Sequence, residues 1–154
     1  MSAELIVKTL KKRKESLSVA ESITGGGLAS AITDIPGASQ VFVGGVVTYS
    51  DELKINELKV SKSVLKKESA VSEAVVIAMA EGARKKFKTT YAIATTGVAG
   101  PGKSYGQKAG TVWIAIASRN NTIAIPLLLS GDRTSIRKAT IDSAIATFSR
   151  ILRA

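Results

Sequence analysis

Histidine and cysteine are both absent from this chain of 154 residues. Without histidine there is no Ser-His-Asp triad, no imidazole general base and no ordinary zinc site. Without cysteine there is no thiol catalysis and no disulfide framework, which is typical of a cytosolic protein. Any general base must therefore be a carboxylate, a lysine, a tyrosine or a bound water.

Aromatic residues and long apolar runs are also scarce. Phe, Trp and Tyr make up 5% of the chain, so the core is expected to consist mostly of Val, Ile, Ala and Leu. No apolar run approaches the length of a membrane span, and the N-terminus lacks a signal-peptide pattern. These absences predict a cytoplasmic protein without a membrane partner.

Positive charge is in excess, with 22 basic against 12 acidic residues and a net charge of +10. A lysine-rich solvated surface explains this balance, and so does affinity for nucleic acid or for phosphorylated substrates. Charge alone does not choose between these explanations.

The length of 154 residues predicts a single domain over residues 1–154. Helices are expected at 3–14, 28–34, after Ser50, after Ser61, at 72–87 and at 131–152, and strands at 16–20, 41–49, 91–95, 111–117 and 122–129. The strand at 41–49 is almost continuously apolar and is expected to be covered on both faces. Helical crossovers make the early strands parallel, and the short last connections make the final ones antiparallel. The pattern indicates a three-layer α/β/α sandwich on a mixed, mostly parallel sheet.

One strand-to-helix turn stands out, with the sequence Glu-Ser-Ile-Thr-Gly-Gly-Gly over residues 21–27. Glycines let a ligand approach bare backbone, and the first N–H groups of a helix have no internal partner. Such a turn can stabilise an anion or a developing oxyanion. Ser22 is the candidate nucleophile. The alternative is that Ser22 or Thr24 merely caps the helix.

A second glycine-rich segment, residues 97–104, formally matches the phosphate-binding pattern G-x-x-x-x-G-K-[ST]. A true P-loop needs a helix to begin at its Lys-Ser end. Here residues 105–110 break a helix and lead into a strand, which argues against a nucleotide hydrolase. The segment is instead expected to line a pocket, where its amides or Lys103 meet a phosphate.

Several segments stand together in the chain: residues 21–26, 47–54 (Val-Thr-Tyr-Ser-Asp-Glu-Leu-Lys), 70–73, 96–102 (Thr-Gly-Val-Ala-Gly-Pro-Gly), 110–113 and 131–133. In their order and spacing they resemble the CinA C-terminal-domain family, whose characterised activity is nicotinamide-nucleotide amidase, also called NMN deamidase. The resemblance covers nearly the whole chain and is to the stand-alone form of the family. It implies a three-layer α/β/α domain, a homo-oligomer (dimer or larger), a small-molecule nucleotide substrate and no cofactor.

The family is proposed to use a serine nucleophile helped by a tyrosine and a lysine, which the motifs place at Ser22, Tyr49 and Lys54. A lysine acts as a base only when neutral near pH 7, so burial or nearby positive charge must lower its pKa. Lys54 is expected close to the positive end of a short helix, which favours this, while Asp51 and Glu52 oppose it. The alternative is a solvated Lys54 and a Tyr49 that only packs at a strand end.

The resemblance implies hydrolysis of a linear amide C–N bond without a metal. Ser22 attacks the carboxamide of nicotinamide mononucleotide, N–H groups of residues 24–26 hold the oxyanion, and a proton passes through Tyr49 and Lys54 as ammonia leaves. Nicotinate mononucleotide is then released. The expected substrate-binding residues are Glu21, Thr24, Gly25, Gly26, Thr96, Gly97, Gly100, Lys103 and Arg133.

The sequence departs from the family pattern in three places. Ile23 stands where many members have cysteine, Thr96 replaces a usual serine, and residues 107–109 (Gln-Lys-Ala) replace a common Lys-Pro-Val. We expect the last change to make the loop more mobile and to alter substrate affinity more than chemistry. The competing hypothesis is a non-catalytic module of competence or DNA metabolism, although no DNA-binding motif or aromatic stacking series is present.

Overall fold

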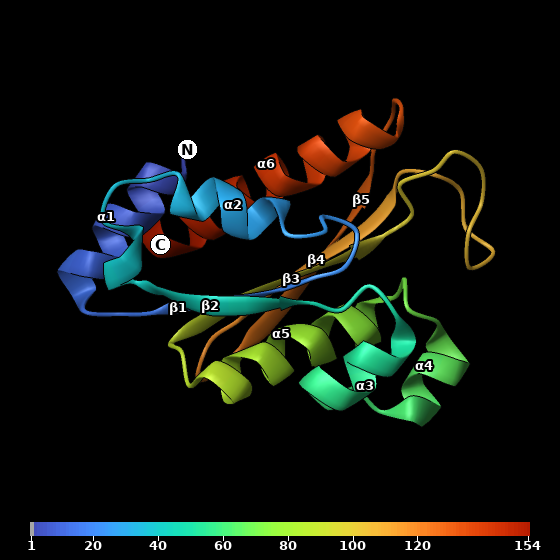
Figure 1. Cartoon of the computed structure of the whole chain (residues 1–154), viewed down its shortest axis with the longest axis horizontal. Helices are drawn as coiled ribbons and strands as arrows, with labels where there is room; N and C mark the ends of the chain where they lie inside the picture. Colours follow the sequence, from blue (N-terminus) through green and yellow to red (C-terminus); the bar gives the residue numbers. More distant parts are fainter. Residues whose placement is uncertain (1) are drawn as a thin grey trace.

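A computed structural model describes residues 2–154 (Figure 1). The elements in chain order are α1 (Ala3–Arg13), β1 (Leu17–Glu21), α2 (Gly27–Thr33), a 3-10 turn (Ala38–Gln40), β2 (Phe42–Val47), α3 (Asp51–Leu58), α4 (Lys62–Glu68), α5 (Glu73–Phe87), β3 (Tyr91–Gly97), β4 (Thr111–Ala117), β5 (Thr122–Leu128) and α6 (Arg133–Arg153). The predicted elements are all found, with ends that shift by a few residues.

The five strands form one sheet in the order β2-β1-β3-β4-β5. β1 is parallel to both β2 and β3, whereas β4 is antiparallel to β3 and to β5. Four of the five strands therefore run in one direction, because β5 reverses β4 just as β4 reverses β3. The predicted mixed, mostly parallel sheet is confirmed.

Helices cover both faces of this sheet (Figure 1). Helices α1, α2 and α6 lie on one face over a core that includes Ile6, Leu28 and Phe148, and α3, α4 and α5 lie on the other over a core that includes Leu58 and Met79. The three-layer α/β/α architecture is thus as predicted. No helix among residues 2–154 combines the length and the apolar character needed to cross a membrane.

The expectation that the strand at 41–49 is covered on both faces is wrong. β2 is an edge strand in which partly buried and exposed residues alternate, and Val43 and Val47 are 58% and 44% exposed. A register irregularity against β1 pairs Leu17 with Phe42 but Ser18 with Gly44, so Val43 is the unpaired extra residue. A continuous apolar run therefore marks the sheet edge here, not its centre.

α3 packs on α5 through backbone contact. A Cβ at Gly82 of α5 would collide with the carbonyl oxygen of Leu58 at the end of α3, so only glycine fits there. Because α3 begins four residues after the end of β2, its N-terminus lies at the carboxyl ends of the parallel strands, where ligands bind in α/β sheets.

Candidate active site

The turn after β1 is shaped by a carboxylate that folds back onto the next helix. Glu21 is 1% exposed, and its side chain accepts hydrogen bonds from the N–H groups of Gly26 (3.2 Å), Leu28 (2.8 Å) and Ala29 (3.0 Å). A negative charge at a helix N-terminus is favourable because it meets unpaired donors and the positive end of the dipole. Glu21 therefore caps α2, and both its oxygens are engaged within the protein.

The alternative reading of Ser22 and Thr24 as helix caps is wrong. The cap residue of α2 is Gly26, and no side chain of a cap residue bonds the helix there. The Thr24 hydroxyl lies instead 2.8 Å from that of Thr95, in the interior. The Ser22 hydroxyl is left for another partner.

That partner is Lys54. Its Nζ donates to Ser22 Oγ at 3.2 Å and to the carbonyl oxygen of Thr48 at 2.8 Å. Lys54 occupies the fourth position of α3, whose N-cap Ser50 accepts from the N–H of Leu53. The amine thus reaches Ser22 directly, without an intervening side chain.

Lys54 is buried, with 1% of its surface exposed. Burial lowers the pKa of its amine below the ordinary lysine value, and the nearby carboxylate of Asp51 opposes the shift as the smaller influence. No carboxylate lies within salt-bridge distance of Lys54 among residues 2–154, so nothing neutralises an ammonium at that depth. Burial therefore makes the neutral amine more accessible here than it is for a lysine in water.

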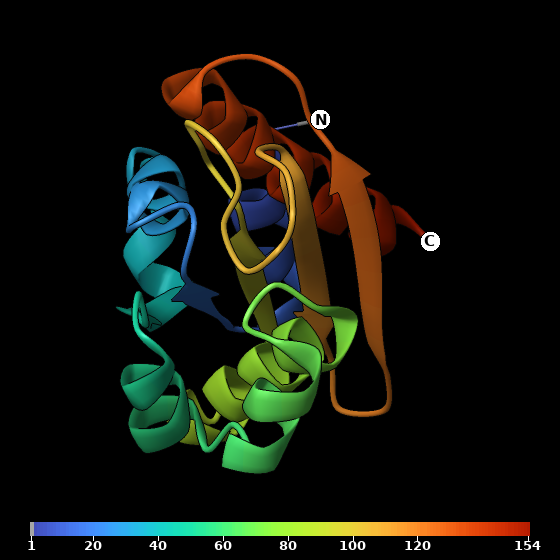
Figure 2. The same ribbon diagram turned by 90° about the vertical axis from the view of Figure 1, so that its right-hand side faces the viewer.

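Ser22 opens on a cavity of about 330 Å³ at the carboxyl end of the parallel strands, a size typical of small-molecule sites. Its lining residues come from the turn after β1, the end of β2, the glycine-rich loop and the start of α6: Ser22, Ile23, Tyr49, Gly97, Val98, Ala99, Gly100, Pro101, Gly102, Lys103, Ser104, Tyr105 and Arg133. Figure 2 looks at this end, where the gold loop lies between α6 and the green helices.

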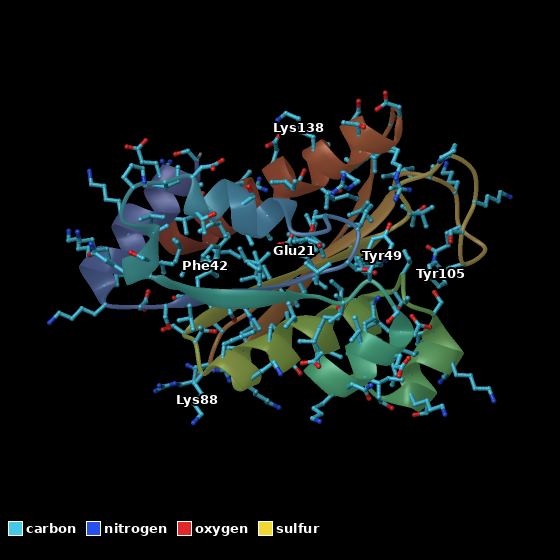
Figure 3. All side chains as sticks on the ribbon, viewed as in Figure 1. Glu21, Phe42, Tyr49, Lys88, Tyr105 and Lys138 are labelled. Atoms are coloured by element: carbon cyan, nitrogen blue, oxygen red, sulfur yellow. The ribbon has the colours of Figure 1, made fainter. Side chains whose placement is uncertain are left out.

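Tyr49 lines the same cavity, but its hydroxyl does not bridge Ser22 and Lys54. The Tyr49 oxygen accepts from Nη2 of Arg133 at 2.8 Å, and Nη1 of Arg133 donates to the carbonyl of Gly100 at 2.7 Å. Figure 3 shows Tyr49 at the loop end of the sheet, well beyond the buried Glu21. The expected proton relay through Tyr49 is absent from the hydrogen bonds of residues 2–154.

The remaining sequence-predicted binding residues divide into two groups. Gly97, Gly100, Lys103 and Arg133 line the cavity, as expected. Glu21, Thr24, Gly25, Gly26 and Thr96 do not; Thr96, for example, is buried and donates to the carbonyl of Ala70 at 2.7 Å. In the structure, the residues of this second group stabilise the turn after β1 and the ends of the strands.

The amides expected to stabilise an oxyanion also need revision. The N–H of Gly25 donates to the carbonyl of Ser22 at 3.1 Å, and that of Gly26 is held by Glu21. The N–H groups of Ile23 and Thr24 donate to no acceptor among residues 2–154. The donors available next to Ser22 are therefore those of Ile23 and Thr24.

Arg137 also contributes to the site, although the sequence does not predict it. Its Nε donates to the carbonyl of Ile23 at 3.1 Å and its Nη2 to that of Thr24 at 2.9 Å, so the guanidinium clamps the turn after Ser22. A fork of donors suits two adjacent carbonyls. The only signal in the sequence is a basic residue one turn after Arg133, on the same helix.

The loop of residues 97–110 leads into β4 and no helix follows it, so the prediction that it is not a true P-loop is confirmed. Gln107 adds a tether, because its Nε2 donates to the carbonyl of Val71 at 2.7 Å. This bond runs against the expected loosening of the loop by residues 107–109. No cluster of three Asp or Glu residues suited to a metal ion occurs in the described part of the chain.

Comparisons with known proteins agree with this architecture. A CinA-like protein of Frankia casuarinae is 43% identical over 96% of this chain, and one of Fervidobacterium nodosum is 46% identical over 88%. The chain spans about one third of the length of these relatives, 34% and 33%.

Solved structures match over nearly their whole length. The crystal structure of competence damage-inducible protein A from Klebsiella pneumoniae is 36% identical, with a TM-score of 0.95 over 98% of this chain and 94% of that one. A competence/damage inducible protein from Agrobacterium tumefaciens is 35% identical, with a TM-score of 0.94 over 99% and 93%. The family model described as "CinA C-terminal domain" matches residues 1–152, and the chain belongs to this family.

Proposed function

We propose that this chain is an amidohydrolase that converts nicotinamide mononucleotide to nicotinate mononucleotide and ammonia. The observation that carries the proposal is the buried Lys54 amine, 3.2 Å from Ser22 Oγ at the wall of a small-molecule cavity. A serine beside a neutral amine is an activated nucleophile that needs no imidazole. This arrangement accounts for a chain without histidine or cysteine.

In the first half of the reaction, Ser22 Oγ attacks the carboxamide carbon while Lys54 Nζ takes the hydroxyl proton. The N–H groups of Ile23 and Thr24 stabilise the tetrahedral oxyanion, in the manner of donors that follow a nucleophilic serine. As the C–N bond breaks, Lys54 returns the proton to the leaving nitrogen, which departs as ammonia. An acyl ester on Ser22 remains.

In the second half, Lys54 takes a proton from water, and the hydroxide attacks the ester carbon. The C–O bond to Ser22 breaks, the proton returns to Ser22 Oγ, and the carboxylic acid leaves as nicotinate mononucleotide. The Tyr49 oxygen accepts from Arg133, and we assign the Tyr49 O–H group to a contact with the substrate.

The 5′-phosphate of the substrate requires cationic or N–H partners. Lys103 lines the cavity, and its amine has no hydrogen-bond or ion-pair partner in the part of the chain that the structure describes. Arg133 already donates to Tyr49 and Gly100, so it contributes charge more than new hydrogen bonds. Lys103 is therefore our preferred phosphate partner.

The test is ammonia release from nicotinamide mononucleotide. Ser22→Ala is expected to lower kcat by about a thousandfold or more, a change of about 4 kcal/mol in the barrier. Ser30→Ala is the matched control, because Ser30 is an exposed serine on the neighbouring helix α2. Normal turnover by Ser22→Ala would remove Ser22 from the mechanism.

A homo-oligomer is part of the same proposal. The edge strand β2 exposes Val43 and Val47, and Leu53 on α3 is also exposed. Such an edge invites pairing with a second copy. Light scattering should give a mass of at least twice 16.1 kDa, and Val43→Lys should lower it toward that of one chain.

A DNA-associated, non-catalytic module is the second candidate. Its supporting observation is a hollow of about 670 Å³ at the opposite end of the sheet, where one acidic residue, Glu15, lies with three basic residues, Arg84, Lys88 and Arg119. None of the three forms a salt bridge with a residue of the described chain. This candidate predicts binding to duplex DNA that weakens steeply with salt and is abolished by Arg84→Glu with Arg119→Glu.

A further inference from the structure

Tyr105 occupies a backbone position that is unfavourable for tyrosine. Ser104 and Gln107 exchange both backbone hydrogen bonds, at 3.0 and 2.9 Å, which makes residues 104–107 a tight hairpin. The two central residues are Tyr105 and Gly106, with φ of 53° and 71°. Such hairpins prefer Asn, Asp or Gly at the first central position, since the side chains of other residues are strained at a positive φ. A strained residue at the mouth of a cavity is a reason to look for a function.

The hairpin is held in place. The Gln107 side chain ties it to the carbonyl of Val71, just before α5. Tyr105 lines the cavity that contains Ser22 and is 50% exposed, so part of its ring is open to a ligand. Figure 3 shows Tyr105 just beyond Tyr49 at the same end of the sheet.

Tyr49 lines the same cavity and is 58% exposed. The two phenol rings do not stack on one another, because the contacting ring pair among residues 2–154 is Tyr91 with Phe148. Burial first, and then Asp51 and Tyr49, raise the pKa of the Tyr105 phenol. The face of a neutral phenol ring carries partial negative charge. An electron-rich ring attracts a cationic or flat aromatic group.

We propose that Tyr105 determines specificity by stacking on the planar nitrogen-containing ring of the ligand at the mouth of the cavity. This inference rests on the proposed function for the identity of that ring. The pyridinium of a nicotinamide nucleotide is planar and positively charged, so it gains both stacking and cation–π attraction from a tyrosine face. An aliphatic amide gains neither, and is bound less tightly.

The experiment measures binding, not turnover. The full chain is titrated calorimetrically with nicotinate mononucleotide, which has the ring but no amide to cleave, and with ribose 5-phosphate, which lacks the ring. Tyr105→Ala should raise the Kd for nicotinate mononucleotide about 5- to 30-fold, from the loss of roughly 1–2 kcal/mol of stacking, and leave the Kd for ribose 5-phosphate unchanged. Alanine is as strained as tyrosine at this φ, so the comparison isolates the ring.

Two variants complete the design. Tyr105→Phe keeps the ring and should bind as the wild type does. Lys62→Ala, a change at an exposed residue of α4 outside the cavity lining, should change nothing. The proposal is overturned if Tyr105→Ala binds nicotinate mononucleotide normally, if it weakens both ligands equally, if Tyr105→Phe falls as far as Tyr105→Ala, or if the wild type does not bind nicotinate mononucleotide. Ring-dependent binding without ammonia release would refute the amidase and leave this inference standing.

Discussion

Lys54→Met tests the buried amine more sharply than any other change. Methionine matches the unbranched shape of lysine but has neither a proton to exchange nor an N–H to donate. The variant loses the bonds to Ser22 Oγ at 3.2 Å and to the Thr48 carbonyl at 2.8 Å. Removal of a general base of this kind should lower kcat/KM for nicotinamide mononucleotide by about 10²- to 10⁴-fold, or about 3–5 kcal/mol.

The same variant has a stability signature with a definite sign. In the folded protein, burial lowers the pKa of Lys54 below its ordinary value of 10.5. The unfolded chain therefore holds more protons between the two pKa values, and the free energy of unfolding attributable to Lys54 rises with pH across that interval. The rise is at most about 1.4 kcal/mol per pH unit for one proton, and Lys54→Met abolishes it.

At low pH the variant loses the hydrogen bond to Thr48, at a cost of about 1–3 kcal/mol, but is relieved of an amine that burial disfavours in its charged form. The measurement is urea unfolding of wild type and variant from pH 6 to about pH 10, with Lys8→Met, an exposed lysine on α1, as the control. A wild-type-minus-variant difference that is flat with pH would contradict the lowered pKa. Retained amidase activity in Lys54→Met would contradict the assignment of the base.

Three further predictions concern the frame around the site. Glu21→Gln removes the charge that holds three N–H groups of α2 and should lower the free energy of unfolding by about 2–4 kcal/mol, whereas exposed Glu52→Gln should leave it within 0.5 kcal/mol in urea titrations. Gly82→Ala sets a methyl against the Leu58 carbonyl and should destabilise by about 3 kcal/mol or more, measured as a thermal midpoint; an unchanged midpoint would refute the close helix contact. Arg133→Met releases the Tyr49 hydroxyl and should lower kcat/KM for nicotinamide mononucleotide about 10-fold. A lower thermal midpoint with unchanged kcat/KM would show that Arg133 has a structural role only.

Much of the fold follows from local pattern. Alternating and helical periodicities locate every element, and the turn chemistry of Ser50 and Ser72 marks two helix starts that the structure confirms. It is harder to predict whether a strand lies at the edge or in the centre of the sheet, because the apolar run of β2 has the pattern of a buried strand. Its exposure depends on its place at the edge of the sheet, which long-range pairing with β1 sets and which nothing local in residues 41–49 indicates.

The site was predictable where one residue type carries the chemistry. Ser22 and Lys54 are predicted from motif and resemblance, and in the structure the Lys54 amine lies 3.2 Å from Ser22 Oγ. The sequence predicts Glu21 as a substrate-binding residue, but its carboxylate accepts from the N–H groups of Gly26 and Leu28 at the start of the next helix. Sequence spacing alone does not show that these amides already have a partner. Arg137 donates to the carbonyls of Ile23 and Thr24, which lie more than a hundred residues earlier in the chain. Sequence spacing does not predict contacts over such a separation.

That separation has a consequence for biosynthesis. The segment that follows Ser22 leaves the ribosome early, but the carbonyl oxygens of Ile23 and Thr24 stay without their guanidinium partner until Arg137 has been translated, 114 and 113 residues later. A nascent chain halted before that point contains the serine and the lysine but not the clamp that orders the loop between them. Competence for catalysis should therefore arise abruptly, near the completion of synthesis, and not grow with chain length.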